Sequence, residues 1–168
     1  MFFVGTYELT IDGKSRLSVP HAIRSKINSD ADGRAFYVVP GFRNHTLALY
    51  PERYFEKLRA FVPPVERLSD RGHAWRQYEY SQSALLDPDS QGRILIPERM
   101  LKRFGIGREV VLIGVQDHLE LWNQAEFEAF ESAIRADAGP ERSDALKELA
   151  ELKRELNGAA STAAHREG

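Results

Sequence analysis

The chain lacks several features on which common protein functions depend. It has no cysteine, which excludes disulfide scaffolds, thiolate zinc sites and cysteine nucleophiles. No apolar run approaches the roughly 18 residues of a membrane helix, and the first eight residues contain no basic segment of the kind that opens a signal peptide. We therefore expect a soluble, cytoplasmic protein that makes no membrane contact.

Patterns for catalysis and metal binding are also missing. The sequence has no glycine-rich phosphate loop, nucleophile elbow or paired-carboxylate arrangement. The histidines do not show the i, i+4 spacing of a metal site, and we interpret them as surface or packing residues: His21, His45, His73, His118 and His165. We expect no catalytic residue, no metal and no cofactor.

Charge is unevenly distributed along the chain. Residues 1–118 hold 17 Lys/Arg and 14 Asp/Glu, a net charge of +3, whereas residues 119–168 hold 6 and 11, a net charge of −5. The two parts give the overall net charge of −2. A mildly basic body is compatible with a polyanion met by a local patch, but charge alone does not indicate nucleic-acid binding.

One short sequence unit occurs twice in the chain. Residues 12–20 read DGKSRLSVP and residues 89–97 read DSQGRILIP, so each copy has Asp-x-x-x-Arg, a strand-like triplet and Pro, at an offset of 77. Residues 37–50 and 109–122 also correspond, at an offset of 72. A unit this small cannot bury a sufficient core alone. The repeat therefore predicts pseudo-symmetric pairing of two copies inside one chain.

Hydrophobic periodicity predicts the same order of elements in each copy: strand, turn, strand, a short helix opened by Pro, and a hairpin. In the first copy we expect strands at 7–11, 17–19, 36–39 and 46–50, a helix at 21–27 and a polar loop at 28–34. In the second we expect strands at 83–86, 94–96, 110–113 and 119–122 and a helix at 97–105.

Further helices are expected around and after the repeats. They lie at 51–61, ended by Pro63-Pro64, at 69–80, after residue 123, and at 140–157, with disorder at 159–168. Asn123 and Glu126 resemble a capping box. Aromatic stripes on the helices after each repeat indicate core or subunit-packing surfaces. For the amphipathic helix at 140–157, packing on its own domain, subunit contact and partner binding stay open.

The two Asp-x-x-x-Arg turns are the best candidates for a binding site. A turn can project Arg toward phosphate oxygens or a guanine edge, while the Asp orients the guanidinium or caps the turn. A single such pattern is more often a solvated ion pair worth ~0–1 kcal/mol. Its duplication at matching places favours function, and the candidate site residues are Asp12, Lys14, Arg16, Asp89, Gln91 and Arg93.

These motifs resemble the MraZ family of bacterial transcriptional regulators over residues 1 to about 135. The resemblance rests on the segment 3–7, the paired Asp-x-x-x-Arg motifs, the strand-Pro-helix after each, and the Leu-Tyr-Pro and Leu-Trp-Asn endings. It implies an α+β fold of two AbrB-like (SpoVT-AbrB) swapped-hairpin modules that form an intrachain pseudo-dimer barrel, with flanking helices and a C-terminal helical tail. It further implies a homo-oligomer, expected to be a closed ring, that binds direct repeats in double-stranded promoter DNA of the division and cell-wall gene cluster and is associated with the nucleoid.

This resemblance gives expected domain boundaries. They are repeat one at 7–53, connecting helices at 54–81, repeat two at 82–125, a flanking helix at 126–138, and a helical then disordered tail at 139–168. The tail after residue 139 lies outside the resemblance.

Two departures from the family pattern bear on the site. The family usually has Lys-Gly before the Arg, whereas the first turn has Lys14-Ser15 and the second has Gln91-Gly92. Ser15 is expected to take the backbone angle of the glycine, at a cost on the order of 1 kcal/mol if φ is positive. Because Gln91 lacks a charge, we expect the second turn to contribute less to binding than the first.

Other functions remain as alternatives to a DNA-binding regulator. One is an AbrB-like antitoxin, which also binds DNA but is usually shorter, with one repeat and a toxin-binding tail. Another is a ring-forming scaffold without a nucleic-acid role, or an unrecognised enzyme. The two turn aspartates could form a symmetric acid pair, but a neighbouring cation is expected to hold each one ionised.

Overall fold

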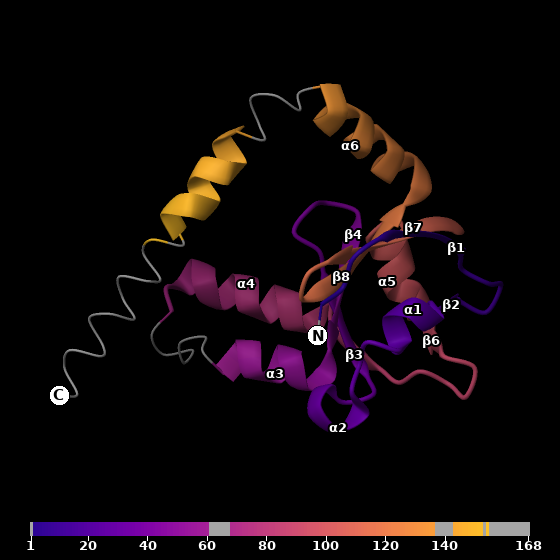
Figure 1. Ribbon diagram of the computed structural model, residues 1–168. Helices are drawn as coiled ribbons and strands as arrows, with labels where there is room; N and C mark the ends of the chain where they lie inside the picture. Colours follow the sequence, from indigo (N-terminus) through magenta and orange to yellow (C-terminus); the bar gives the residue numbers. More distant parts are fainter. Residues whose placement is uncertain (1, 61–67, 137–142, 153, 155–168) are drawn as a thin grey trace. The chain divides into compact units, whose positions relative to one another are not determined.

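The computed structural model describes residues 2–60, 68–136, 143–152 and 154 (Figure 1). It forms two compact units, of which the first ends at Phe127 and the second begins at Glu128. The first unit has an α+β fold with a mostly antiparallel sheet. The elements of the two repeats are β1 (Thr6–Thr10), β2 (Arg16–Ser18), α1 (His21–Arg24), α2 (Ser29–Asp32), β3 (Phe36–Pro40), β4 (Thr46–Pro51), β5 (Ala84–Leu86), β6 (Arg93–Leu95), α5 (Glu98–Arg103), β7 (Glu109–Val115) and β8 (His118–Asn123).

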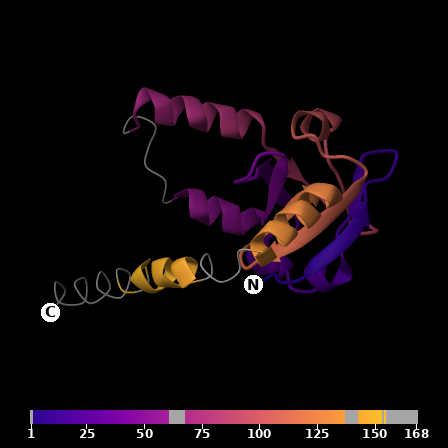
Figure 2. The same cartoon turned by 90° about the horizontal axis from the view of Figure 1, so that it is seen from above.

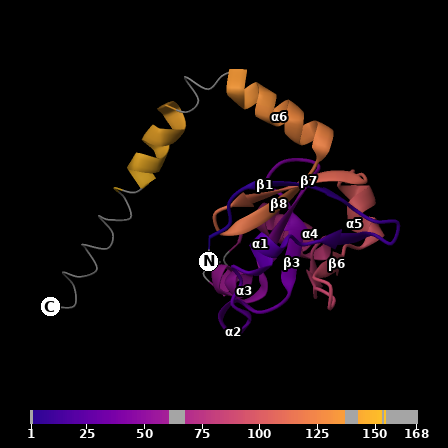
Figure 3. The same ribbon diagram turned by 45° about the vertical axis from the view of Figure 1, so that its right-hand side comes forward.

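The two repeats share one six-stranded sheet with the order β1-β7-β8-β4-β3-β5. β1 of the first repeat pairs with β7 of the second, and β5 of the second pairs with β3 of the first. The two hairpins meet where β4 pairs with β8. Figure 3 shows β1, β7 and β8 side by side. Each repeat thus completes its sheet with a strand of the other, as the duplicated sequence predicts.

The register of the strands reveals a pseudo-two-fold relation. Leu17 and Ile94 occupy equivalent places in the two repeats, and they lie directly opposite each other where β2 pairs with β6. Ala48 and Glu120 are likewise equivalent and lie opposite each other where β4 pairs with β8. Equivalent residues face each other only where a two-fold axis passes between them. The axis therefore runs through the centre of both strand pairs.

The expected closed barrel is not seen among the described residues. β2 and β6 form a separate two-stranded ribbon, and β1 and β5 remain the edges of the larger sheet. β2 and β6 have three residues each and are followed within two residues by Pro20 and Pro97. Proline has no N–H to donate, so the ladder of each strand stops at this residue and the ribbon stays short.

The core lies between this ribbon and the sheet. Leu17 and Ile94, from the inner face of the ribbon, are fully buried with residues of all four hairpin strands. The helices opened by Pro20 and Pro97 each bury one equivalent side chain in the same cluster, Ile23 and Met100. These contacts hold the ribbon against the sheet and leave its outer face available.

Three longer helices accompany the repeats: α3 (Glu52–Ala60), α4 (Asp70–Ser81) and α6 (Gln124–Ala136). An ion pair between Arg59 and Glu79 joins α3 to α4, which Figure 2 shows as two separate, roughly parallel helices. α3 buries Phe55, whereas every residue of α4 and α6 is partly or fully exposed. Phe127, in the aromatic stripe predicted after the second repeat, is half-buried and packs edge-on against Trp122, with ring centroids 5.8 Å apart.

Several local predictions need correction. α1 ends at Arg24 rather than near residue 27, and the expected polar loop contains α2, because the Asn28 side chain accepts hydrogen bonds from the N–H groups of Asp30 and Ala31. The expected capping box is also wrong. The Asn123 side chain instead accepts from Gly107 N–H and donates to the Gly105 carbonyl, and Glu126 contacts His45.

The expected tail helix is present where the structure describes it. Residues 143–152 and 154 are helical, and Leu146, Leu149 and Leu152 are exposed. The Pro63-Pro64 break, the expected end of the preceding helix at Phe61, and the expected disorder at 159–168 lie outside the described residues.

Candidate nucleic-acid interface

The first Asp-x-x-x-Arg turn is organised by the carboxylate of Asp12. Its Oδ1 accepts hydrogen bonds from the N–H groups of Lys14 and Arg16, at 2.8 and 3.0 Å. Its Oδ2 accepts from the Arg16 guanidinium through Nε at 2.7 Å and Nη2 at 2.6 Å. The Asp therefore caps the turn and orients the Arg at the same time, which the sequence left as alternatives.

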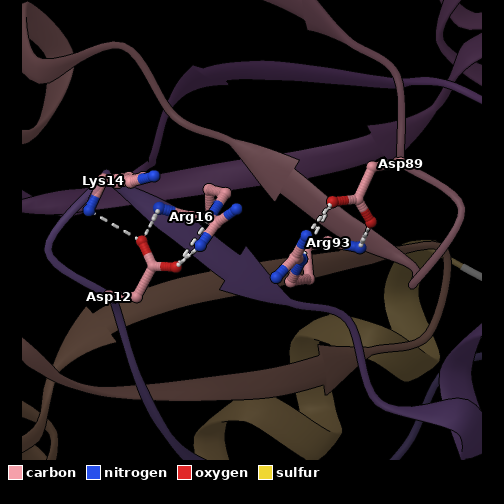
Figure 4. Close-up of polar contacts among 5 residues, drawn as sticks. All are labelled: Asp12, Lys14, Arg16, Asp89 and Arg93. Carbon is pink, nitrogen blue, oxygen red and sulfur yellow. Dashed lines mark hydrogen bonds and ion pairs between the residues drawn. The ribbon is translucent and has the colours of Figure 1, made fainter.

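The second turn repeats this arrangement atom by atom. Asp89 Oδ1 accepts from the N–H groups of Gln91 and Arg93, at 2.9 and 3.0 Å, and its Oδ2 lies 2.8 Å from Nε and 2.7 Å from Nη2 of Arg93. Figure 4 shows both turns with their dashed contacts. The duplicated motif thus produces duplicated geometry.

Backbone conformation explains the glycine that the motif prefers. Ser15 has φ of 60° and Gly92 has φ of 75°. Both values lie in the left-handed region, where residues other than glycine pay about 1–2 kcal/mol. The expectation that Ser15 takes the glycine conformation is confirmed. The first turn consequently carries backbone strain that the second turn avoids.

Each guanidinium keeps donors for a ligand. An arginine has five N–H donors, and the Asp engages the side edge formed by Nε and Nη2. Nη1 and the second hydrogen of Nη2 form the far end of the guanidinium, which we call the fork end. Among the described residues, neither Arg16 nor Arg93 bonds another side chain through its fork end. This end-on pair can bind two acceptors of one phosphate or the O6 and N7 of guanine.

The same contacts fix the charge of the two carboxylates. The side-chain hydrogen bond from Arg16 is the largest cause that lowers the pKa of Asp12 from 3.8 to about 2. Arg93 lowers the pKa of Asp89 to about 2 in the same way. Both groups are ionised at neutral pH, so they cannot serve as an acid–base pair and act instead as fixed anchors for the arginines.

The β2–β6 ribbon places the two turns on one surface. Side chains alternate along each strand, so Leu17 and Ile94 point into the core while Arg16, Ser18, Arg93 and Leu95 lie on the outer face. Arg16 pairs with Leu95 and Ser18 pairs with Arg93, which makes the two arginines diagonal neighbours at about 7–8 Å between backbones. Figure 4 shows them on adjacent antiparallel strands.

The remaining predicted site residues are exposed at the turn tips. Lys14 and Gln91 are both exposed, and their backbone N–H groups are the ones bonded by Asp12 and Asp89. All six predicted site residues therefore lie in the two turns or at the adjoining ends of the ribbon.

Sequence reasoning missed two residues at this surface. Leu95 is 58% exposed on the outer face of the ribbon, directly opposite Arg16 and two residues after Arg93 on the same strand. The alternation of Arg93-Ile94-Leu95-Ile96 contains that signal, because the residue at the equivalent position of the first repeat is the polar Ser18. The second residue is Arg24, whose guanidinium lies against Gly92 of the second turn. No local pattern indicates this contact, since it joins residues 68 positions apart in the chain.

A separate polar cluster links the two repeats, between α3 and the β7–β8 hairpin. The Tyr54 hydroxyl donates to Asp117 at 2.6 Å, and this bond is the main cause that raises the pKa of Tyr54 to about 12. His118 lies between Asp117 and Glu120 and stacks on Tyr50 at 4.7 Å. Burial opposes its charge, but the hydrogen bonds to Glu120 and Asp117 raise the pKa of His118 overall. These contacts join α3 to the β7–β8 hairpin.

The described part of the chain contains no group of three or more metal-ligating side chains and no helix long and apolar enough to span a membrane. Of the five histidines, His165 lies outside that part.

Comparisons with known proteins agree on one family. Residues 80–147 match the family model described as "MraZ protein, putative antitoxin-like". The chain is 34% identical over 145 residues to the "Transcriptional regulator MraZ" of Burkholderia cenocepacia (strain HI2424) and of Burkholderia orbicola (strain MC0-3), covering 86% of this chain and 96% of each relative. It is 34% identical over 139 residues to the protein of the same name from Burkholderia mallei (strain SAVP1), covering 83% and 94%.

Proposed function

Because the chain belongs to the MraZ family, we propose that it is a sequence-specific DNA-binding transcriptional regulator rather than an enzyme. The observation that carries this proposal is the β2–β6 ribbon with two Asp-anchored arginines on its outer face. A two-stranded ribbon fits the major groove, which is about 12 Å wide, and β-ribbons are an established means of reading it. The surface is thus suited in width, charge and donor geometry to duplex DNA.

In this proposal the six turn residues have different roles. Arg16 and Arg93 donate to guanine edges or phosphates through their free fork ends, and Asp12 and Asp89 hold them in position. Lys14 adds a phosphate contact at the first turn, and the Gln91 amide can bond to a base or a phosphate at the second.

The finer architecture is proposed on the same basis. The exchange of β1 and β5 between repeats supports reading the repeats, at 7–53 and 82–125, as swapped-hairpin modules of the AbrB type. The segments 54–81, 126–138 and 139–168 then act as connecting helices, flanking helix and tail. The exposed apolar side chains of α4 and of residues 143–152 favour self-association, and we propose a ring-shaped homo-oligomer.

Oligomerisation explains how a chain of net charge −2 can bind DNA. One protomer offers few turn cations, whereas tight complexes make roughly 6–10 phosphate contacts. Several protomers side by side reach that number on direct repeats. By resemblance, the proposed target is the promoter of the division and cell-wall gene cluster, and the proposed location is the cytoplasm, at the nucleoid.

The proposal is tested by measuring affinity against salt on DNA with one, two and three direct repeats from the region upstream of the coding sequence. Because each neutralised phosphate contributes roughly 0.9 to the log–log slope, the slope should steepen as repeats are added, with a gain in affinity from effective concentration. A slope and affinity that do not depend on repeat number would reject the oligomeric mechanism. Absence of binding to every duplex would reject DNA binding itself.

The description "antitoxin-like" of the matching family model favours a second candidate, an AbrB-like antitoxin. The two candidates share the DNA surface and differ in the partner of the tail. Purification of the native complex separates them, because an antitoxin would retain a toxin of different mass at a fixed stoichiometry.

A further inference from the structure

An arginine of the first repeat lies against the turn of the second. A Cβ atom built on Gly92 would lie 2.6 Å from both Nε and Cζ of Arg24. Arg24 Nε donates to the Val19 carbonyl at 3.0 Å, and Val19 N–H donates to the Gly92 carbonyl at 3.0 Å. The absence of a side chain at Gly92 thus makes room for the guanidinium, which is held against the residue that precedes Arg93 in the chain.

The pseudo-two-fold relation shows that this contact exists at one turn only. The backbone bond from Val19 to Gly92 has its equivalent in the bond from Ile96 N–H to the Ser15 carbonyl, at 2.9 Å. The residue equivalent to Arg24 is Leu101, which has no charge. The first turn carries its own Lys14, whereas the second has the neutral Gln91 at that place. Each turn therefore has its Arg and one further cation, and for the second turn that cation is Arg24.

Arg24 also borders a cavity of about 360 Å³ beside the second turn. Arg34 lines the same cavity, together with Ser90 and Gly92 of the turn and an apolar floor that includes Phe36. Asp89, the carboxylate at this cavity, is already engaged by Arg93. Among the described residues, neither Arg24 nor Arg34 pairs with a carboxylate, so both guanidiniums are available to an external anion.

We propose that Arg24 and Arg34 form a phosphate site beside the second turn, and that it binds a backbone phosphate of the DNA whose bases face the ribbon. Arg24 supplies the charge that Gln91 lacks. This inference rests on the proposed function. It also revises the expectation that the second turn is the weaker one, because Arg24 then takes at the second turn the place that Lys14 has at the first.

The test compares the salt dependence of DNA binding for variants of the full-length protein. Arg24→Gln should weaken binding about tenfold or more, as expected for the loss of charge-assisted hydrogen bonds, and should reduce the log–log salt slope by roughly 0.9 for each engaged protomer. Arg24→Lys should retain the slope. Adding Gln91→Lys to Arg24→Gln should restore it, because the lysine then stands where Lys14 stands in the first turn.

Lys26→Ala is the matched control. Lys26 is an exposed cation two residues along the chain, but it borders a different hollow, near Phe2 and Tyr7, and its removal should leave the slope unchanged. If Arg24 had only a structural role, Arg24→Lys would fail like Arg24→Gln and Gln91→Lys would not rescue it. Either result overturns the inference.

Three further outcomes are decisive. If wild-type protein binds the DNA and Arg24→Gln has the wild-type salt slope, the phosphate site is rejected and the proposed function stands. If wild-type protein does not bind the DNA, the proposed function itself is rejected. A free phosphorylated molecule is the other source of phosphate for the same cavity. Inorganic phosphate that shifts NMR signals of the turn in wild-type protein but not in Arg24→Gln, with an unchanged DNA slope, would assign the site to that source and refute the DNA contact.

Discussion

Replacing Ser15 with glycine is expected to stabilise the protein. Ser15 has φ of 60°, a conformation that costs a residue with a Cβ about 1–2 kcal/mol. Glycine removes this strain but has more freedom to lose in the unfolded chain, which costs roughly 0.5–1 kcal/mol. The bonds that close the turn are made by the backbone and by the Asp12 carboxylate, so they survive the change. The net gain should be about 0.5–1 kcal/mol.

The reverse change in the second turn should be more harmful than the strain alone. In Gly92→Ser the serine must adopt the same unfavourable left-handed conformation, and its Cβ would lie 2.6 Å from the Arg24 guanidinium. Arg24 must then move and lose its bond to the Val19 carbonyl, worth roughly 0.5–1.5 kcal/mol. Serine also restricts the unfolded chain, which offsets roughly 0.5–1 kcal/mol of this cost. Destabilisation of about 1–2.5 kcal/mol is therefore expected.

Both changes can be measured by urea unfolding and by thermal melting. For a chain of this size, 1 kcal/mol shifts Tm by about 2–4 °C, so Ser15→Gly should raise Tm by about 1–4 °C and leave DNA affinity unaltered. The reasoning is refuted if Ser15→Gly lowers stability, or if Gly92→Ser is neutral, because neither result is compatible with the turn conformations described.

Two other predictions concern acid stability and assembly. The pKa values of Asp12 and Asp89 are lowered to about 2 from 3.8, so their contribution to stability is complete above about pH 4 and is lost as the pH falls toward 2. The unfolding free energy of the double variant Asp12→Asn/Asp89→Asn should therefore depend less on pH over this range. A pH profile equal to that of the wild type would contradict the prediction. The protein should also self-associate through exposed apolar side chains such as Trp75 and Leu149, so light scattering at micromolar concentration should give a mass several times 19.1 kDa, and a monomer mass would reject this.

Local chemistry explains how much of the site could be predicted from sequence. The Asp-x-x-x-Arg turns depend on side-chain bonds to backbone N–H groups only a few residues away. The family pattern predicted that Ser15 takes the backbone conformation of a glycine, and its φ of 60° agrees with that. The alternating strands and the pairing of the repeats follow from the same duplicated pattern.

The features of the fold and the site that could not be predicted depend on contacts between residues distant in the sequence. Asn123 has the sequence context of an N-cap, but its side chain instead accepts a hydrogen bond from Gly107, in a loop 16 residues earlier. Two short strands ended by Pro20 and Pro97 stay apart from the larger sheet, which the resemblance alone did not indicate. Arg24 reaches the second turn only because the pseudo-two-fold pairing places β2 beside β6 and Gly92 leaves room for it.

The central claim is that the two Asp-anchored arginines read DNA, and comparison of Arg16→Ala with Arg93→Ala tests it most directly. The measurement is affinity for a duplex with three direct repeats and for a scrambled duplex, with circular dichroism to verify the fold and Lys57→Ala on α3 as an exposed control. Losing one bidentate base contact costs about 1–3 kcal/mol, so each arginine variant should lose roughly 5–150-fold in specific affinity while scrambled DNA is affected much less. Folded variants that keep wild-type affinity and specificity would contradict the account.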